Sequence, residues 1–201
     1  MSAFRVRRIA AGEGAALRDV RLRALADTPL AFGSTHAREA ALPGEHWLEW
    51  AAASAGDGAA QALFVAEAAE ADAEPPGAGE GSAAEPPGAG ERSAAEPPAA
   101  AASAPLVGLA FVLVDPGDPT RANLFSMWVA PEARGSGAGT ALVAAGVDWV
   151  RARGVRILRT AVTVGNDAAA RLYARAGFAD TGTREPLGHS DTEVRVLALA
   201  L

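Results

Sequence analysis

A glycine-rich turn, Gly135-Ser136-Gly137-Ala138-Gly139, is the clearest place in the sequence for chemistry. It follows an apolar segment that ends at Val129 and leads into a helix-forming segment. Glycines lack a Cβ atom, so backbone N–H groups in such a turn can point at an anion and approach it closely. The positive end of the following helix faces the same point. The turn therefore predicts a cradle for a diphosphate, to which Arg134 adds positive charge.

Two common phosphate-binding motifs do not fit this turn. A P-loop requires a lysine, and the sequence contains none. The dinucleotide pattern G-x-G-x-x-G requires a third glycine, but Thr140 or Leu142 stands there, depending on the starting glycine. On this turn alone, a plain glycine-rich connection between a strand and a helix stays open as the alternative.

A second pattern runs from Asn166 to Phe178 and reads N-x-x-A-x-x-L-Y-x-x-x-G-F. Asn166 is suited to cap a helix, and Gly177 is suited to end it. Tyr173 is the one tyrosine of the chain. Taken alone, Tyr173 also fits a packed aromatic residue whose hydroxyl reaches the surface.

Together, Arg134-x-x-Gly137-x-Gly139 and the pattern after Asn166 resemble the coenzyme A signature of the GCN5-related N-acetyltransferases. The resemblance is specific from Leu124 to Phe178. Residues 25–34 also resemble the loop at which acceptors bind in many bacterial members. The resemblance implies a mixed sheet whose fourth and fifth strands splay apart, with the pantetheine arm of acyl-CoA lying between them.

The resemblance further implies an N-acetyltransferase in which a primary amine attacks the thioester of acetyl-CoA directly. Acetyl-CoA is then a cosubstrate, and no metal is needed. The backbone N–H near Val129 would stabilise the oxyanion, Tyr173 would protonate the leaving thiolate, and Asn166 would contact pantetheine or position the acetyl group. The residues expected to contact acetyl-CoA are Met127, Trp128, Val129, Arg134, Gly135, Ser136, Gly137, Ala138, Gly139, Thr140, Asn166 and Tyr173.

The general base is not evident from the sequence. Many members of this family carry a glutamate on the fourth strand, but residues 123–129 contain no carboxylate. A catalytically idle domain that binds acyl-CoA as a sensor or partner therefore stays open. The absence of cysteine excludes a covalent cysteine intermediate. A chain of water molecules is one alternative for the base; the side-chain candidates are Glu39, Glu45, His36, His189, Asp191 and Glu193.

Apolar patterning and turn residues predict the elements that must position these motifs. The order β-α-α-β-β-β-α-β-α-β-β predicts an α/β fold, with a mixed sheet covered by helices. The expected helices are 14–26, 44–53, 137–153 and 167–176. The expected strands are 4–9, 62–66, 106–114, 124–129, 155–164, 178–183 and 194–201.

Residues 66–104 differ from the rest of this single domain, which spans 1–201. They contain only Ala, Glu, Gly, Pro and Ser apart from Asp72 and Arg92, with a recurring Glu-Pro-Pro unit. Lacking larger apolar side chains, they are predicted to be a disordered insert in the hairpin between the second and third strands. Their acidic residues account for the net charge of −6.

Composition also sets expectations about the surroundings of the protein. Arginine without lysine is typical of a GC-rich bacterial genome, and no apolar run is long enough for a membrane helix. We expect a cytoplasmic monomer or homodimer without nucleic-acid or membrane partners. Its acceptor would be a small-molecule amine or a protein N-terminus. The histidines His36, His46 and His189 have no metal-ligand spacing.

Overall fold

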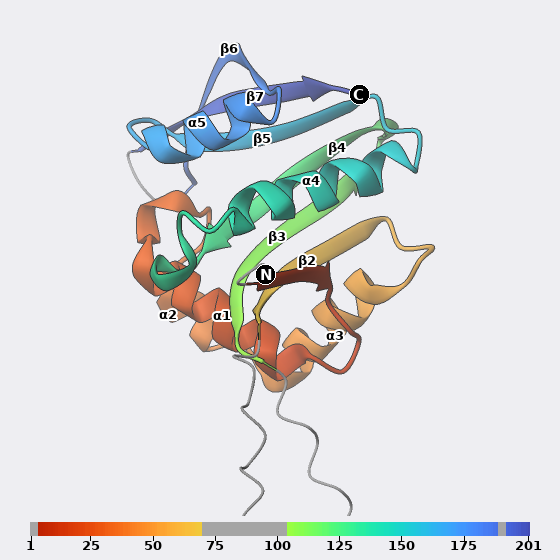
Figure 1. Ribbon diagram of the computed structural model, residues 1–201, viewed down its shortest axis with the longest axis vertical. Coiled ribbons are helices and arrows are strands. Elements are labelled where there is room, and N and C mark those ends of the chain that lie inside the picture. Colours follow the sequence, from red (N-terminus) through yellow and green to blue (C-terminus); the bar gives the residue numbers. More distant parts are fainter. Residues whose placement is uncertain (1–3, 70–103, 189–191) are drawn as a thin grey trace, which may run out of the picture.

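A seven-stranded mixed sheet forms the centre of the computed structural model, which describes residues 4–69, 104–188 and 192–201 (Figure 1). The strand order is β1-β2-β3-β4-β5-β7-β6, and β4–β5 is the parallel pair in it. The predicted α/β class and mixed sheet are confirmed. The strands are β1 (Phe4–Arg8), β2 (Gln61–Ala68), β3 (Leu106–Asp115), β4 (Asp118–Val129), β5 (Ile157–Thr163), β6 (Ala179–Pro186) and β7 (Glu193–Ala200).

Five α-helices accompany the sheet in the described residues. Four of them were predicted; the short α2 was not, because its single turn is too brief to show a hydrophobic period. Thr35 caps α2, with its hydroxyl accepting a hydrogen bond from the Arg38 N–H at 3.3 Å. The helices are α1 (Gly14–Asp27), α2 (His36–Ala40), α3 (Gly44–Ala55), α4 (Ala138–Arg151) and α5 (Asp167–Arg175).

Helices cover both faces of the sheet, as two residues of β3 show. A Cβ atom on Gly108 would lie 3.0 Å from Leu142 Cδ1 of α4, so glycine permits a close approach there. Phe111 instead meets Trp50 of α3 edge to face, with ring centroids 5.5 Å apart. Successive side chains of a strand point to opposite faces, so α4 covers one face and α1 with α3 the other.

Strand β2 extends further than predicted, to Ala68, and so enters the segment 66–104. The Ala68 N–H donates to the Pro105 carbonyl at 3.0 Å, which brings the ends of β2 and β3 together. The prediction of a disordered insert falls largely on residues 70–103, which lie outside the described residues, as do 1–3 and 189–191.

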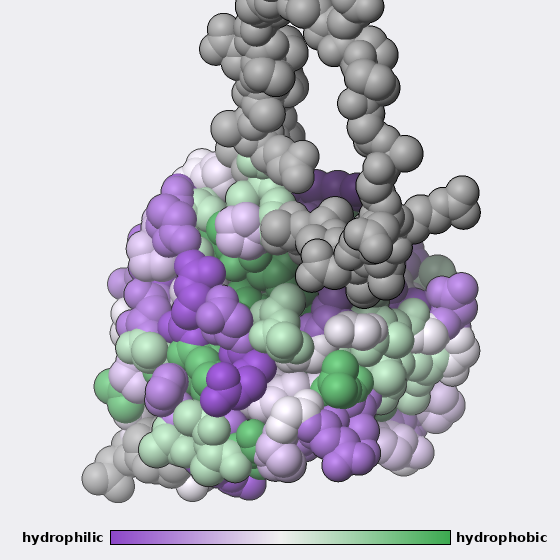
Figure 2. All heavy atoms as spheres, turned by 90° about the horizontal axis from the view of Figure 1, so that it is seen from below, coloured by the Kyte–Doolittle hydropathy of each residue, from purple (hydrophilic) through white to green (hydrophobic). Residues whose placement is uncertain are grey.

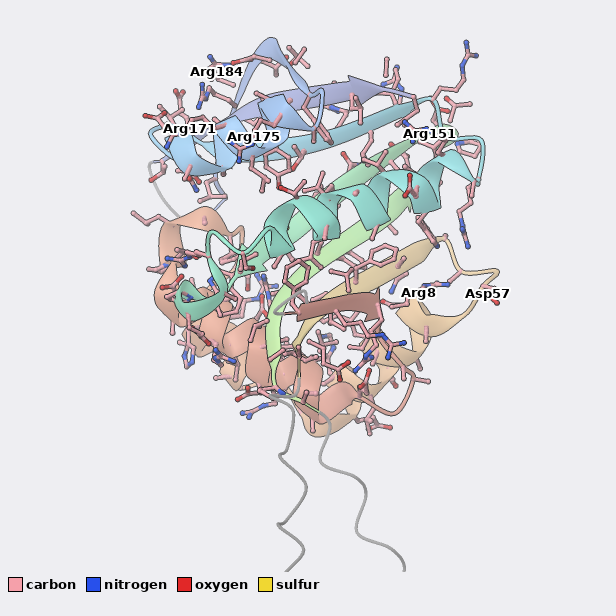
Figure 3. The ribbon with its side chains drawn as sticks, viewed as in Figure 1. Arg8, Asp57, Arg151, Arg171, Arg175 and Arg184 are labelled. Carbon is pink, nitrogen blue, oxygen red and sulfur yellow. The ribbon has the colours of Figure 1, made fainter. Side chains whose placement is uncertain are left out.

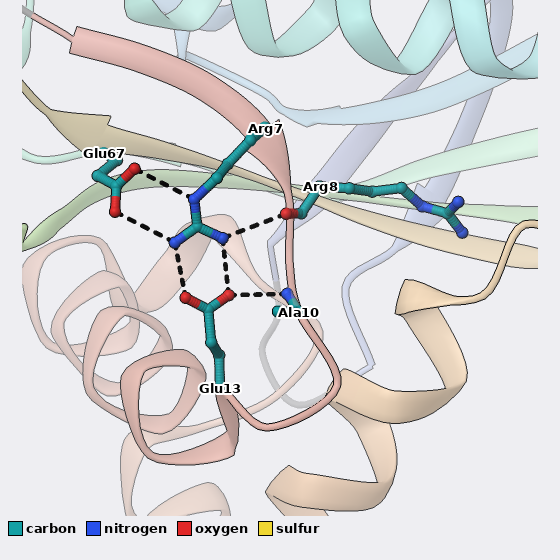
Figure 4. A network of polar contacts seen from close by, with 5 residues as sticks. All are labelled: Arg7, Arg8, Ala10, Glu13 and Glu67. Atoms are coloured by element: carbon teal, nitrogen blue, oxygen red, sulfur yellow. Dashed lines mark hydrogen bonds and ion pairs between the residues drawn. The ribbon is translucent and has the colours of Figure 1, made fainter. Parts of the chain in front are cut away.

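The outer edge of the sheet at β1 is tied down by the side chain of Arg7 (Figure 4). Its guanidinium donates to both carboxylate oxygens of Glu13 at 2.6 and 2.7 Å, and to both of Glu67 at 3.1 and 3.2 Å. It also donates to the Arg8 carbonyl at 3.2 Å. The network joins β1 to β2 and to the start of α1.

The surface seen from below in Figure 2 carries hydrophilic side chains interspersed with smaller apolar groups. Among the described residues, every helix is too short or too polar to cross a membrane.

Candidate functional site

The parallel strands β4 and β5 pair over only part of their length. Their register runs from Arg121 opposite Ile157 to Leu124 opposite Thr160 and then stops. Beyond that point β5 continues to pair with β7, while residues 125–129 of β4 pair only with β3. The two strands therefore diverge, which confirms the predicted splay and leaves one edge of β4 without a strand partner.

A β-bulge lies in β4 just beyond Leu124, the last residue of β4 that pairs with β5. The register against β3 changes from Phe111 opposite Phe125 to Leu109 opposite Trp128, so β4 holds one extra residue there. Ser126 in this bulge has a φ of 52° and is the one non-glycine residue with positive φ in the described part of the chain. The bulge therefore shifts the alternation of β4 by one residue.

This shift determines which backbone groups face the split. Ala130 N–H donates to the Val107 carbonyl at 2.8 Å, and hydrogen-bonded pairs alternate with non-bonded pairs in antiparallel strands. Val129, opposite Gly108, is thus in a non-bonded pair, and its N–H points away from β3. Before the bulge it is Leu124 whose carbonyl faces β5, where it accepts from the Thr160 hydroxyl at 3.0 Å.

The glycine-rich turn stands at the open end of the split. Gly135 and Gly137 have φ values of 80° and 95°, and Gly137 is the residue before the first turn of α4. A Cβ atom on Gly139 would lie 3.3 Å from Met127 Cε, so glycine keeps the space beside β4 open. Gly139 and Thr140, in the first turn of α4, line the space beside the split, so their N–H groups suit a diphosphate, whereas the Ala138 N–H donates to Ser136 Oγ at 3.3 Å.

A cavity of about 540 Å³ joins the turn, the free edge of β4 and one side of α5. Most of the residues predicted to contact acetyl-CoA line it. Ser136 and Ala138 belong to the turn but not to the cavity wall, and Tyr173 lies outside the wall as well. The predicted residues on the wall are Met127, Trp128, Val129, Arg134, Gly135, Gly137, Gly139, Thr140 and Asn166.

The side chain of Arg134 is engaged by the protein itself. It pairs with the Asp27 carboxylate and donates from Nε to the Val129 carbonyl at 3.1 Å. Asp27 also accepts from Trp128 Nε1 at 2.8 Å. Much of the charge that Arg134 was predicted to add is therefore offset by Asp27, and the contacts fix the turn against β4.

Arg175 is a cavity residue that the sequence analysis missed. It lines the cavity with Ala168, Ala169 and Leu172, which share one side of α5 because they are spaced three or four residues apart. Within the described ranges neither Arg175 nor Arg171, one turn earlier, has an ion-pair partner (Figure 3). The helical spacing from Ala168 to Arg175 was the signal that could have found it.

Asn166 has two roles in the geometry. Its side-chain oxygen accepts a hydrogen bond from the Ala169 N–H at 3.1 Å and so caps α5, as predicted. The same residue lines the cavity. Since the oxygen serves the cap, the amide NH₂ group is the part that can donate to a ligand.

Tyr173 is buried, and its ring is edge-on to that of Phe178 with the ring centroids 5.3 Å apart. Its hydroxyl shares a hydrogen bond with the side chain of Thr160, the residue that forms the last β4–β5 pair. Burial raises the pKa of Tyr173 to about 12, against the smaller opposing effect of the Thr160 hydroxyl. The hydroxyl is thus protonated at neutral pH and lies at the apex of the split.

The candidates for a general base are not gathered at the split. His36, Glu45 and Glu193 are exposed, and His189 and Asp191 lie outside the described residues. Glu39 is buried; burial favours its neutral form, but the hydrogen bonds and charge of Arg21 outweigh this and hold its pKa below the usual value. In the part of the chain that the structure describes, His, Asp and Glu side chains form no metal-binding group of three or more.

Comparisons with known proteins agree with this geometry. Residues 68–178 match the model of the acetyltransferase (GNAT) family. No curated protein matches the chain. A GCN5-related N-acetyltransferase from Kribbella flavida is 19% identical, with a TM-score of 0.66 over 99% of this chain and 98% of that one.

Two further solved structures show the same fold. A ribosomal-protein-alanine N-acetyltransferase from Brucella melitensis is 22% identical and has a TM-score of 0.66, with 98% of this chain and 99% of that chain covered. A putative acetyltransferase from Salmonella typhimurium, solved with its cofactor acetyl-CoA, is 18% identical with a TM-score of 0.66, over 98% and 94% of the two chains.

Proposed function

The chain belongs to the acetyltransferase (GNAT) family, and on that basis we propose that it transfers an acetyl group from acetyl-CoA to a primary amine. The observation that carries the proposal is the cavity that joins the glycine-rich turn to the free edge of β4. One end of this cavity suits a diphosphate, and the other end presents backbone donors beside a buried phenol. Acetyl-CoA has an anionic group and a reactive thioester at opposite ends of an extended arm.

The glycine-rich turn is the proposed site for the diphosphate. Gly137 and Gly139 leave room for close approach, and the first turn of α4 offers N–H donors with the positive end of the helix dipole. Because Asp27 offsets the charge of Arg134, we assign the neutralising charge to Arg175, with Arg171 one turn away. The Asn166 amide is the proposed donor to the pantetheine arm.

The Val129 N–H is the proposed oxyanion donor. As the amine nitrogen attacks the acetyl carbonyl, negative charge develops on the carbonyl oxygen, and a preorganised backbone donor stabilises it. The C–S bond then breaks, and the leaving thiolate takes a proton from the Tyr173 hydroxyl. Burial keeps that hydroxyl protonated at neutral pH, and its place at the apex of the split supports this assignment.

The amine must also lose a proton to become a nucleophile. Residues 123–129 carry no carboxylate for this step, and both oxygens of Glu39 already accept hydrogen bonds from Arg21. We therefore assign the proton transfer to water beside the attacking amine. A small-molecule amine and a protein N-terminus both fit this scheme. The structurally similar Brucella enzyme, a ribosomal-protein-alanine N-acetyltransferase, makes a protein acceptor worth testing first.

The proposal is tested by incubating the full chain with acetyl-CoA and a panel of amines, and by measuring the thiol that is released. The panel contains polyamines, amino acids, aminoglycosides and peptides with free N-termini. Thiol release that depends on one amine class supports the proposal. CoA binding without turnover of any amine instead favours an acyl-CoA-binding sensor or partner domain, which the missing strand-four carboxylate leaves open. A bacterial cytoplasm is the proposed setting.

A further inference from the structure

A buried ion pair joins α1 to α2 on the face of the sheet opposite α4. Arg21 Nε and one terminal nitrogen donate to the two Glu39 oxygens at 2.8 and 2.7 Å. Arg21 is only 5% exposed and Glu39 only 8%. Such a pair contributes little net stability, because removing two charges from water offsets most of their attraction. The burial of this pair therefore needs an explanation other than stability of the fold.

The remaining terminal nitrogen of Arg21 donates to the hydroxyl of Ser126 at 3.2 Å. The guanidinium also lies over the Phe32 ring, 4.7 Å from its centroid. Because Glu39 occupies Nε and one terminal nitrogen, the group is held in one orientation with its last donor aimed at β4. The pair thus connects two helices to a single residue of the sheet.

Ser126 is a residue that needs such support. Its left-handed conformation is unfavourable for a residue with a Cβ atom. The bulge there sets which alternate residues of β4 face the split. Without the extra residue, the alternation that points the Leu124 carbonyl at β5 would direct the backbone of Trp128 into the split, and that of Val129 toward β3.

We propose that the Arg21–Glu39 pair is a positioning device, which holds the Ser126 bulge and thereby aims the Val129 N–H at the acetyl carbonyl. This inference rests on the proposed function, because the oxyanion donor belongs to it. Arg21, Glu39 and Ser126 do not line the cavity proposed for acetyl-CoA. In this proposal they act through the backbone of residues 126–129.

The test compares Ser126→Ala with Ser126→Gly. Alanine removes the hydroxyl and keeps the Cβ strain, so kcat falls by about tenfold as the donor moves out of line, while the KM for acetyl-CoA stays within about twofold. Glycine also removes the hydroxyl but adopts positive φ without strain, so it retains most of kcat. Equal losses in the two variants, or a loss confined to KM, would overturn the inference.

Ser54→Ala is the matched control. Ser54 is a fully buried serine whose hydroxyl donates to the Trp50 carbonyl at 2.8 Å and accepts from Gln61 at 3.0 Å, away from β4. The Ser54→Ala variant loses hydrogen bonds comparable to those lost in Ser126→Ala, but we expect its kcat to be unchanged. A fall in kcat equal to that of Ser126→Ala would show that destabilisation alone explains the effect.

The double variant Arg21→Met/Glu39→Met tests the pair itself without leaving a buried charge unpaired. It lowers kcat by the same factor as Ser126→Ala, and adding Ser126→Ala to it causes no further loss, since both changes break one link. Additive losses would separate the pair from the bulge and overturn the proposal.

Backbone amide exchange provides a readout that does not depend on turnover. In protein without CoA, Ser126→Ala changes the exchange rates and chemical shifts of the amides of residues 127–129, and Ser54→Ala does not. Unaltered amides in Ser126→Ala overturn the positioning role. If the wild type turns over no amine while these amides still respond, the proposed function fails and the structural link between Arg21 and the bulge stands.

Discussion

The edge of the sheet at β1 and the split between β4 and β5 treat their polar groups in opposite ways. At β1, Arg7 makes five hydrogen bonds, and both carboxylates around it are satisfied within the protein. At the split, the Val129 N–H points away from β3, and within the described part of the chain the Gly139 and Thr140 N–H groups in the first turn of α4 have no hydrogen-bond acceptor. Groups used by the fold are satisfied internally, whereas groups left open are available to a ligand. Changes at the split should therefore alter activity, and changes at β1 should alter stability.

Tyr173→Phe should have the largest effect. The ring still packs on Phe178, but no hydroxyl protonates the thiolate, so we expect kcat to fall by about 10²–10⁴. CoA affinity should change little. Because the protonated phenol is the active form and its pKa is raised to about 12, wild-type kcat should lose this contribution only as the pH rises toward 12. Steady-state rates with a true acceptor measure both effects; wild-type turnover in the variant would assign Tyr173 to packing alone.

Gly137→Val should abolish the rise in melting temperature that CoA causes. A β-branched side chain at a φ of 95° is strained and obstructs the diphosphate, so affinity should fall by at least about tenfold. Gly154→Val is the matched control, since Gly154 has a φ of 73°, no neighbour within 4 Å of a Cβ atom, and a place at the far end of α4. It should lose similar stability and keep the CoA response. A normal response in Gly137→Val would locate the diphosphate elsewhere.

Arg175→Gln should weaken CoA binding by about tenfold at low salt and less at high salt, because exposed charges are screened. Arg151→Gln is the control. Arg151 is the last residue of α4, at the end away from the glycine-rich turn, so its replacement should leave CoA binding unchanged (Figure 3). Isothermal titration at two salt concentrations measures the difference. Equal binding by the two variants would return the role of counter-charge to Arg134.

Glu13→Gln should affect stability and leave turnover unaffected. Removing the charge from the Arg7 network should lower the free energy of unfolding by about 1 kcal/mol at pH 7. Hydrogen bonds from Arg7 hold the pKa of Glu13 below its usual 4.5, so this contribution is present above that pH and is lost as the pH falls through the folded-state value. Urea unfolding should therefore show a difference at pH 7 that shrinks below pH 4.5. A loss of kcat would contradict the separation of the two regions.

Removing residues 70–103 and joining Ala69 to Ala104 with a short turn should have the smallest effect. The ends of β2 and β3 are already adjacent at Ala68 and Pro105, and no residue of β2 or β3 lines the cavity. We expect CoA affinity within about twofold of the full chain, since surface connections tolerate changes in length. Failure to fold, or a large loss of affinity in calorimetry, would show that the segment supports the domain.

Much of the fold and part of the site could be predicted from the sequence, because they depend on local patterns. Glycines at 135, 137 and 139 indicate a turn that leaves space for a ligand. The pattern that forms α5 begins with Asn166, which caps the helix. The helical and strand periods gave the element order. The ends of β2 and β4 were misjudged because pairing between strands, which a single segment does not encode, extends them.

The rest of the site depends on contacts between distant segments. Ser126 has no local signature of a bulge, since serine is common in strands and turns alike. The sequence offered Glu39 only as a candidate general base and assigned no role to Arg21, and only the packing of α1, α2 and β4 buries them together. Arg134 was expected to serve the ligand, but Asp27, more than a hundred residues earlier, engages it.

The hydrogen bond between Ala68 and Pro105 has a consequence for how this gene can vary. It closes the β2–β3 hairpin at its base, so the DNA between these two codons can gain or lose whole units by replication slippage while the register of both strands is preserved. Doubling the length of a connection between two fixed ends costs only about 0.6 kcal/mol in closure entropy. The Glu-Pro-Pro units that recur from Glu74 to Pro98 have the form that such slippage produces. Closely related strains should therefore differ in the number of these units more than in any other part of the chain.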